Sequence, residues 1–170
     1  MPKNKDAKTA SARKTRHRRI LVGFTALVLV VISSFGVWHT LHSSATVCTE
    51  SYRNDKTVTL HDTEVKAEVV DTPSAQVQGL SGKRCLPADQ TMLFVFDRDD
   101  DYCFWMKDMN FPIDIIWLNS KKNVVSIITG AQPSTYPKNF CPGYPTRYVL
   151  EMPAGTVGRT ETTYGDTIDF

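Results

Sequence analysis

Histidine is scarce in this chain. Only four of the 170 residues are histidines, and only His61 lies well beyond an apolar segment near the N-terminus. A catalytic zinc site usually needs two or three histidines, and a Ser-His-Asp or Cys-His mechanism would have to rest on His61 alone. The sequence therefore argues against hydrolases of these classes. We lean towards a protein without catalytic residues.

Recognisable metal-binding motifs are missing as well. The four cysteines are separated by 37, 18 and 38 residues, so the chain has no C-x-x-C pair of a zinc ribbon or thioredoxin-like site. Asp97, Asp99 and Asp101 have the spacing of a calcium loop, but Tyr102 stands where the loop needs glycine and Asp108 where it needs glutamate. We interpret the three aspartates as a solvated turn between strands, and we expect no metal and no cofactor.

Residues 20–38 carry no charge at all. As a helix, this stretch would span roughly 28 Å, which is close to the hydrocarbon thickness of a bilayer. Residues 1–19 hold eight Lys or Arg against the single acid Asp6, and such a cluster favours the cytoplasmic side. The pattern predicts a basic cytoplasmic tail over residues 1–19 and one transmembrane helix, a signal anchor, over residues 20–38. The remainder would lie outside the cytoplasm.

The alternative is a secreted protein whose signal peptide is cleaved. Ser43, Ser44 and Ala45 are the small residues that a signal peptidase prefers, and residues 20–32 alone are long enough for a signal core. The uncharged continuation to Trp38 favours the retained anchor.

All four cysteines follow the apolar stretch. An even number in an oxidising compartment predicts up to two disulfides, with three possible pairings. We favour Cys48 with Cys85 and Cys103 with Cys141. Beyond residue 19 the chain has 12 basic and 17 acidic residues, a net charge of −5, so we expect no nucleic-acid partner.

One domain is expected over residues 56–170, after a polar tether over residues 39–55. Apolar runs bounded by turn residues predict strands, over residues 64–70, 92–96, 102–107, 113–118, 124–129, 147–152 and 167–170. Thr72-Pro73 predicts the start of a short helix that ends at Gly79. Together these features predict an all-β domain, an antiparallel sandwich or barrel with one short helix.

Five side chains are candidates for a ligand site. Trp105 and Lys107 share one face of an expected strand, and Asp114 begins the next strand, opposite Lys107. The plain interpretation is a cross-strand ion pair that holds the turn. The functional interpretation is that these three line a pocket for a small polar ligand, with further polar contacts from Arg147 and Glu151, four residues apart on a later strand.

Several short motifs occur in one order along the outer domain: Val70-Asp71-Thr72-Pro73, Gly79-Leu80-Ser81-Gly82, Met92-Leu93-Phe94-Val95-Phe96, Phe104-Trp105-Met106-Lys107, Pro112-Ile113-Asp114-Ile115, Arg147-Tyr148-Val149-Leu150-Glu151 and Pro153-Ala154-Gly155. In this combination they resemble the domain of unknown function family 192. The resemblance implies a compact β-sandwich, often placed behind a signal or membrane anchor, and no particular activity. The segment after Gly155 departs from the pattern, because relatives look more helical there.

The sequence thus favours a binding module, an anchored domain outside the cytoplasm that holds a small ligand or a cell-envelope component. One alternative is a histidine-independent enzyme that uses Asp114 or Glu151 as a general base. Another is a purely structural envelope domain. A pocket with a strongly shifted carboxylate would favour the enzyme, a shallow apolar groove would favour binding, and a closed surface with Lys107 paired would favour the structural role.

Overall fold

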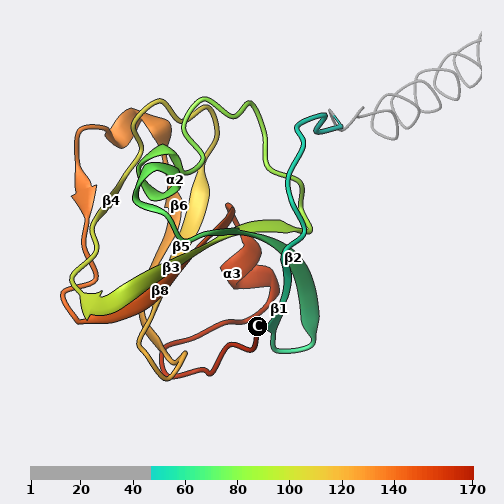
Figure 1. Cartoon of the computed structure of the whole chain (residues 1–170). Helices are drawn as coiled ribbons and strands as arrows, with labels where there is room; N and C mark the ends of the chain where they lie inside the picture. The colour runs from blue at the N-terminus through green and yellow to red at the C-terminus, as the bar shows by residue number, and fades with distance from the viewer. Residues whose placement is uncertain (1–46) are drawn as a thin grey trace, which may run out of the picture. The chain divides into compact units, whose positions relative to one another are not determined.

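The computed structural model describes residues 47–170 (Figure 1). Six strands form the main sheet: β1 (Lys56–Leu60), β2 (Thr63–Val70), β3 (Gln90–Asp100), β5 (Ile113–Leu118), β6 (Val124–Ala131) and β8 (Thr146–Pro153). Two short strands form a second sheet: β4 (Phe104–Trp105) and β7 (Asn139–Phe140). The helical elements are also short: α2 (Pro73–Gln78), the 3-10 turn η1 (Pro133–Thr135) and α3 (Thr156–Arg159). The expectation of a mostly β domain is confirmed, but the domain has a second short helix, α3, where the sequence predicts only one helix.

The main sheet is mixed, with strand order β1-β2-β3-β8-β5-β6. Strands β2 and β3 run parallel, and every other neighbouring pair in this sheet is antiparallel. The antiparallel arrangement predicted from the sequence is therefore wrong at one pair. Parallel neighbours need a long crossover connection, and here it contains α2.

Helix α2 forms where the sequence predicts it. Thr72 caps its first turn, because the Thr72 side chain accepts a hydrogen bond from the backbone N–H of Ala75 at 3.4 Å. Pro73 occupies the first turn, where its missing N–H costs nothing. Gly79 ends the helix with φ +46°, a conformation that other residues rarely adopt. These local signals position one wall of the pocket described below.

Both faces of the main sheet are covered, which explains why every residue of β5 is buried. Ile116 and Leu118 of β5 point into one core, which α3 closes with Val157. Ile115 and Trp117 of the same strand point into a second core on the opposite face, where the chain after α2 packs. Figure 1 shows α2 and α3 on the two sides of the sheet.

Several strand boundaries differ from the sequence prediction. β3 continues through Asp97 to Asp100, which pairs with Thr146 of β8, so most of the predicted aspartate turn is strand. The predicted strand over residues 102–107 is reduced to β4, and β4 pairs with β7, not with β5. The predicted last strand is replaced by two isolated bridges, in which residues 167–169 contact the turn before β6 and the edge strand β1.

The two disulfides have the favoured pairing. Cys48 is bonded to Cys85, and Cys103 is bonded to Cys141. The first bond attaches the N-terminal segment of the described chain to the loop after α2, and the second lies beside the β4–β7 pair.

Removal of either disulfide should destabilise the domain by a similar amount. The bonds close loops of 37 and 38 residues, so each should contribute about 4 kcal/mol by restricting the unfolded chain. Urea denaturation of the double serine variants Cys48→Ser/Cys85→Ser and Cys103→Ser/Cys141→Ser would measure both effects. An unchanged midpoint for either variant would show that its bond adds no stability.

The basic tail over residues 1–19, the transmembrane helix over residues 20–38 and residues 39–46 of the tether over residues 39–55 lie outside the described residues. Within residues 47–170, no helix is long and apolar enough to cross a membrane. Residues 47–55 have no regular secondary structure, but they are attached to the domain by the Cys48–Cys85 disulfide and by a hydrogen bond from the Tyr52 hydroxyl to the Cys85 carbonyl at 2.6 Å.

Candidate ligand pocket

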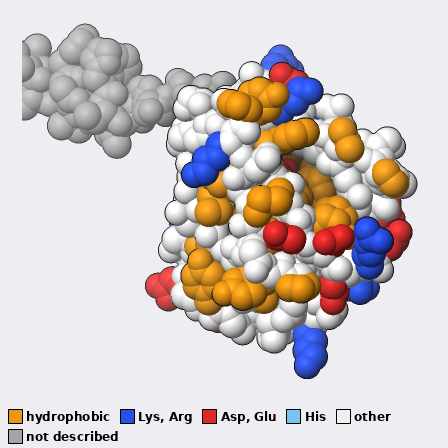
Figure 2. Space-filling model, turned by 90° about the vertical axis from the view of Figure 1, so that its left-hand side faces the viewer, with side chains coloured by type: hydrophobic (Ala, Val, Ile, Leu, Met, Phe, Trp, Pro, Cys, Tyr) orange, Lys and Arg blue, Asp and Glu red, His pale blue; other side chains and the backbone are white. Residues whose placement is uncertain are grey.

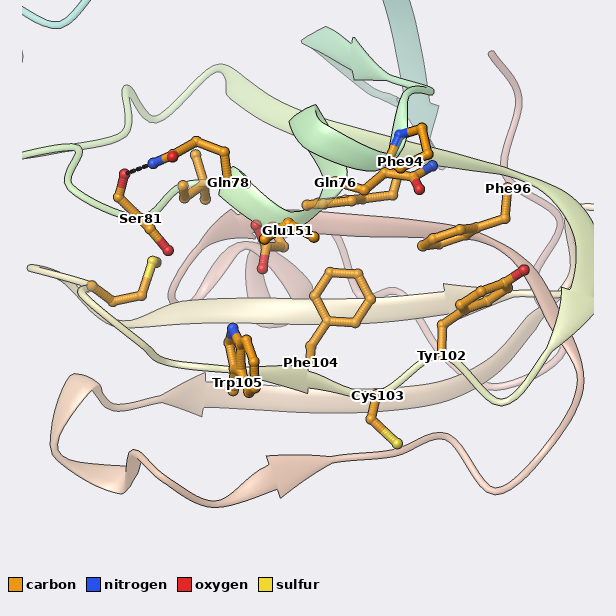
Figure 3. Close-up of a pocket in the computed structure, with 15 residues that line it drawn as sticks. Gln76, Gln78, Ser81, Phe94, Phe96, Tyr102, Cys103, Phe104, Trp105 and Glu151 are labelled. Atoms are coloured by element: carbon orange, nitrogen blue, oxygen red, sulfur yellow. Dashed lines mark hydrogen bonds between the residues drawn. The ribbon is translucent and has the colours of Figure 1, made fainter.

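A cavity of about 310 Å³ opens on the face of the sheet that carries α2 (Figure 3). Residues of α2 and the glycine that follows it form one side, and residues 102–105 form the other. Strand β3 supplies Phe94 and Phe96, and β8 supplies Glu151. Figure 2 shows a hollow on this face of the molecule, bordered largely by hydrophobic side chains. The volume is at the small end of the range for pockets that bind small molecules.

Five aromatic residues contribute to the wall of the cavity: Phe94, Phe96, Tyr102, Phe104 and Trp105. Phe94 and Phe104 pack edge to face with ring centres 4.8 Å apart, and Phe96 stacks on Tyr102 at 3.5 Å. The segment that carries Tyr102 and Phe104 is held to the sheet because the indole N–H of Trp117 donates a hydrogen bond to the Tyr102 carbonyl at 2.8 Å. Packing and this hydrogen bond together fix the rings that face the cavity.

Glu151 is the acidic group of the cavity. Strand β8 lies in the middle of the sheet, and Glu151 has Met92 of β3 and Ile115 of β5 as its neighbours across the strands. The residue is only 4% exposed, and its Oε2 atom has no hydrogen-bond partner within the described residues. Burial raises the pKa of Glu151 from 4.5 to about 8, because the apolar surroundings disfavour the charged form.

A glycine keeps the space above this carboxyl open. A Cβ atom at Gly79 would lie 3.4 Å from Cζ of Phe94 and 3.8 Å from Oε2 of Glu151. The residue that ends α2 therefore also leaves room beside the buried acid. In Figure 3 the Glu151 carboxyl lies between the α2 side and the aromatic side of the pocket.

Two of the five residues singled out in the sequence line this cavity: Trp105 and Glu151. Trp105 is 47% exposed and packs edge to face against Tyr136, so it belongs to the rim. The sequence pattern does not single out Phe94, Phe96 or Tyr102, because aromatic residues in strands are by default core residues. Only their position around Glu151 distinguishes them.

The other three residues lie elsewhere. The predicted cross-strand ion pair of Lys107 with Asp114 is wrong, because β4 does not pair with β5. Lys107 is exposed, whereas Asp114 is fully buried and accepts hydrogen bonds from two backbone N–H groups, of Gly130 at 2.8 Å and of Val157 at 2.9 Å. Arg147 lies outside the pocket lining, and its Nε donates to Asp99 Oδ1 at 2.7 Å.

No group of three or more His, Cys, Asp or Glu residues within residues 47–170 is arranged to hold a metal ion.

Comparison with known families gives one match, over residues 56–170, to the DUF192 model, described as "Uncharacterized ACR". The chain belongs to the DUF192 family. The resemblance found in the sequence motifs is thereby confirmed. The family description carries no activity. None of the curated proteins matches the chain significantly.

Two solved structures resemble this DUF192 domain. A candidate transcription regulator from Sinorhizobium meliloti 1021 is 31% identical, with a TM-score of 0.61 over 63% of this chain and 82% of that chain. A protein of unknown function from Novosphingobium aromaticivorans DSM 12444 is 24% identical, with a TM-score of 0.63 over 74% of this chain and 94% of that chain. The second likeness concerns the fold alone.

Proposed function

We propose that this DUF192 domain is a small-ligand binding module, and that the cavity around Glu151 is its binding site. The observation that carries the proposal is the buried Glu151 carboxyl, whose Oε2 atom has no hydrogen-bond partner in the described part of the chain. A buried polar atom without a partner costs free energy, and a bound donor would recover it. The aromatic wall would bury the apolar part of the same ligand.

The second part of the proposal is that the domain is anchored outside the cytoplasm. The two disulfides support an oxidising compartment. The uncharged residues 20–38 behind a basic tail support a transmembrane signal anchor, with the N-terminus in the cytoplasm. In that setting the ligand would be a small molecule or a component of the cell envelope.

An enzyme is the second candidate, and the same carboxyl favours it. A glutamate whose pKa is about 8 in a cavity is protonated at neutral pH, so it would act as a general acid there and not as the base suggested by the sequence. Asp114, the other suggested base, already accepts two backbone hydrogen bonds. The hydroxyl of Ser81 donates to the carbonyl of Lys107 at 2.8 Å, so it is not poised as a nucleophile. Binding therefore ranks first.

A thermal-shift screen of the oxidised protein against small molecules would test the proposal. At a hundred times its dissociation constant, a ligand that binds only the folded state adds about 2.7 kcal/mol of stability. Trp105→Ala, at the rim of the cavity, should abolish the response. Tyr144→Ala, which removes another exposed aromatic residue outside this cavity, should keep it. A ligand whose effect survives Trp105→Ala and Glu151→Gln would place the binding site elsewhere.

A further inference from the structure

The ionisable carboxyl in the cavity lining has no basic side chain beside it among the described residues. Within residues 47–170, the side chains that line the cavity include the carboxyl of Glu151 and no Lys, Arg or His. The polar groups opposite Glu151 are the neutral amides of Gln76 and Gln78 and the hydroxyl of Ser81. An anionic ligand would find no compensating charge here, and burying an uncompensated charge is costly.

The rings of the wall favour positive charge for a second reason. The face of an aromatic ring is electron-rich and attracts ammonium groups, most strongly where water is excluded. Tyr102 lines the cavity with one face of its ring stacked on Phe96, and its hydroxyl donates to the carbonyl of Arg98 at 3.0 Å. Phe94, Phe104 and Trp105 add further rings on the other sides of Glu151 (Figure 3).

We propose that the pocket binds an organic cation, an amine or a quaternary ammonium, with its positive group against Glu151 and its apolar part among the aromatic rings. This inference rests on the proposed function and narrows it to one ligand class. A cation favours ionisation of Glu151 in place, because it supplies the counter-charge that the described side chains lining the cavity do not provide.

Binding of such a cation should release a proton. Glu151 holds a proton near neutral pH in the free protein, and the bound cation favours the carboxylate. Its strand neighbours Met92 and Ile115 are apolar, α2 carries no ionisable side chain, and Cys103 is held in a disulfide. Among the lining residues of the described chain only the Tyr102 phenol remains as another ionisable group, and its hydroxyl is engaged with the backbone. Glu151 should therefore govern the pH dependence.

A matched pair of probes tests the inference directly. Choline and 3,3-dimethylbutan-1-ol have nearly the same shape, but only choline is charged, and its charge does not change with pH. Each would be titrated into the whole chain in maltoside micelles, with the indole N–H signal of Trp105 followed by NMR. At pH 8.5 we expect choline to bind at least tenfold more tightly than the alcohol. Its affinity should fall about tenfold per pH unit between pH 7 and pH 6.

Two variants separate pairing at Glu151 from a general effect of surface charge. Glu151→Gln should reduce the preference for choline to within about twofold and remove the pH dependence. Asp97→Asn removes an exposed acid that does not line this cavity, and it should leave both unchanged.

Three outcomes would overturn the cation inference: equal binding of the two probes, an affinity for choline that does not vary with pH, or no binding of choline at millimolar concentration. Equal binding would leave the proposed binding function intact, with a neutral ligand. The proposed function would fail separately, if no compound in the wider screen gave a response that depends on Trp105.

Discussion

Between pH 4 and pH 9 the parent protein should lose roughly 5 kcal/mol of unfolding free energy through Glu151, and Glu151→Gln should remove this loss. In the folded protein burial raises the pKa of Glu151 to about 8, whereas the unfolded chain titrates near the ordinary value of 4.5. Between these two values the folded state holds a proton that the unfolded state has released. Rising pH therefore favours unfolding, by about 1.4 kcal/mol per pH unit, until the folded carboxyl also ionises.

Urea denaturation at one-unit steps from pH 4 to pH 9 would measure the effect. The difference in unfolding free energy between Glu151→Gln and the parent protein should be small at pH 4, should rise steadily and should level off above pH 8. Glu64→Gln, at an exposed position of β2, serves as the matched control and should run parallel to the parent. A Glu151→Gln curve that also ran parallel would show that the buried carboxyl is ionised or paired in solution.

Asp114→Ala should lower the unfolding free energy by about 4 kcal/mol, because each buried N–H left without an acceptor costs roughly 1 to 3 kcal/mol. The register between β5 and β6 shifts after Ile113, and the Asp114 carboxylate accepts from the N–H of Gly130 next to this irregularity. The other carboxylate oxygen accepts from the N–H of Val157 in α3. One buried side chain thus joins β5, β6 and the helix on one face of the sheet.

The informative control is Lys107→Ala, because the sequence predicts that Lys107 forms an ion pair with Asp114. Because Lys107 is exposed, this variant should stay within about 0.5 kcal/mol of the parent. Chemical denaturation of both variants would decide between the two arrangements. Equal losses for Lys107→Ala and Asp114→Ala would restore the predicted ion pair and contradict the structure.

Local signals explain what the sequence predicts well. The limits of β5 and α2 follow from a compact apolar run and from a Thr-Pro start with a glycine end, which depend only on neighbouring residues. Strand pairing, in contrast, does not depend on neighbouring residues alone. The partner of β4 is β7, 35 residues later, and the sequence pattern around Trp105 is equally compatible with a hairpin to β5.

Glu151 shows the difference between what the sequence determines and what only the tertiary structure decides. The sequence by itself determined that an acid stands in an apolar strand, that four cysteines follow an uncharged stretch and that the family motifs occur in order. Only the tertiary structure decided that this acid is buried and faces an aromatic cavity, because its environment comes from β3, β5, α2 and residues 102–105. Burial and the pKa of a side chain are set by non-local neighbours, which no local pattern specifies.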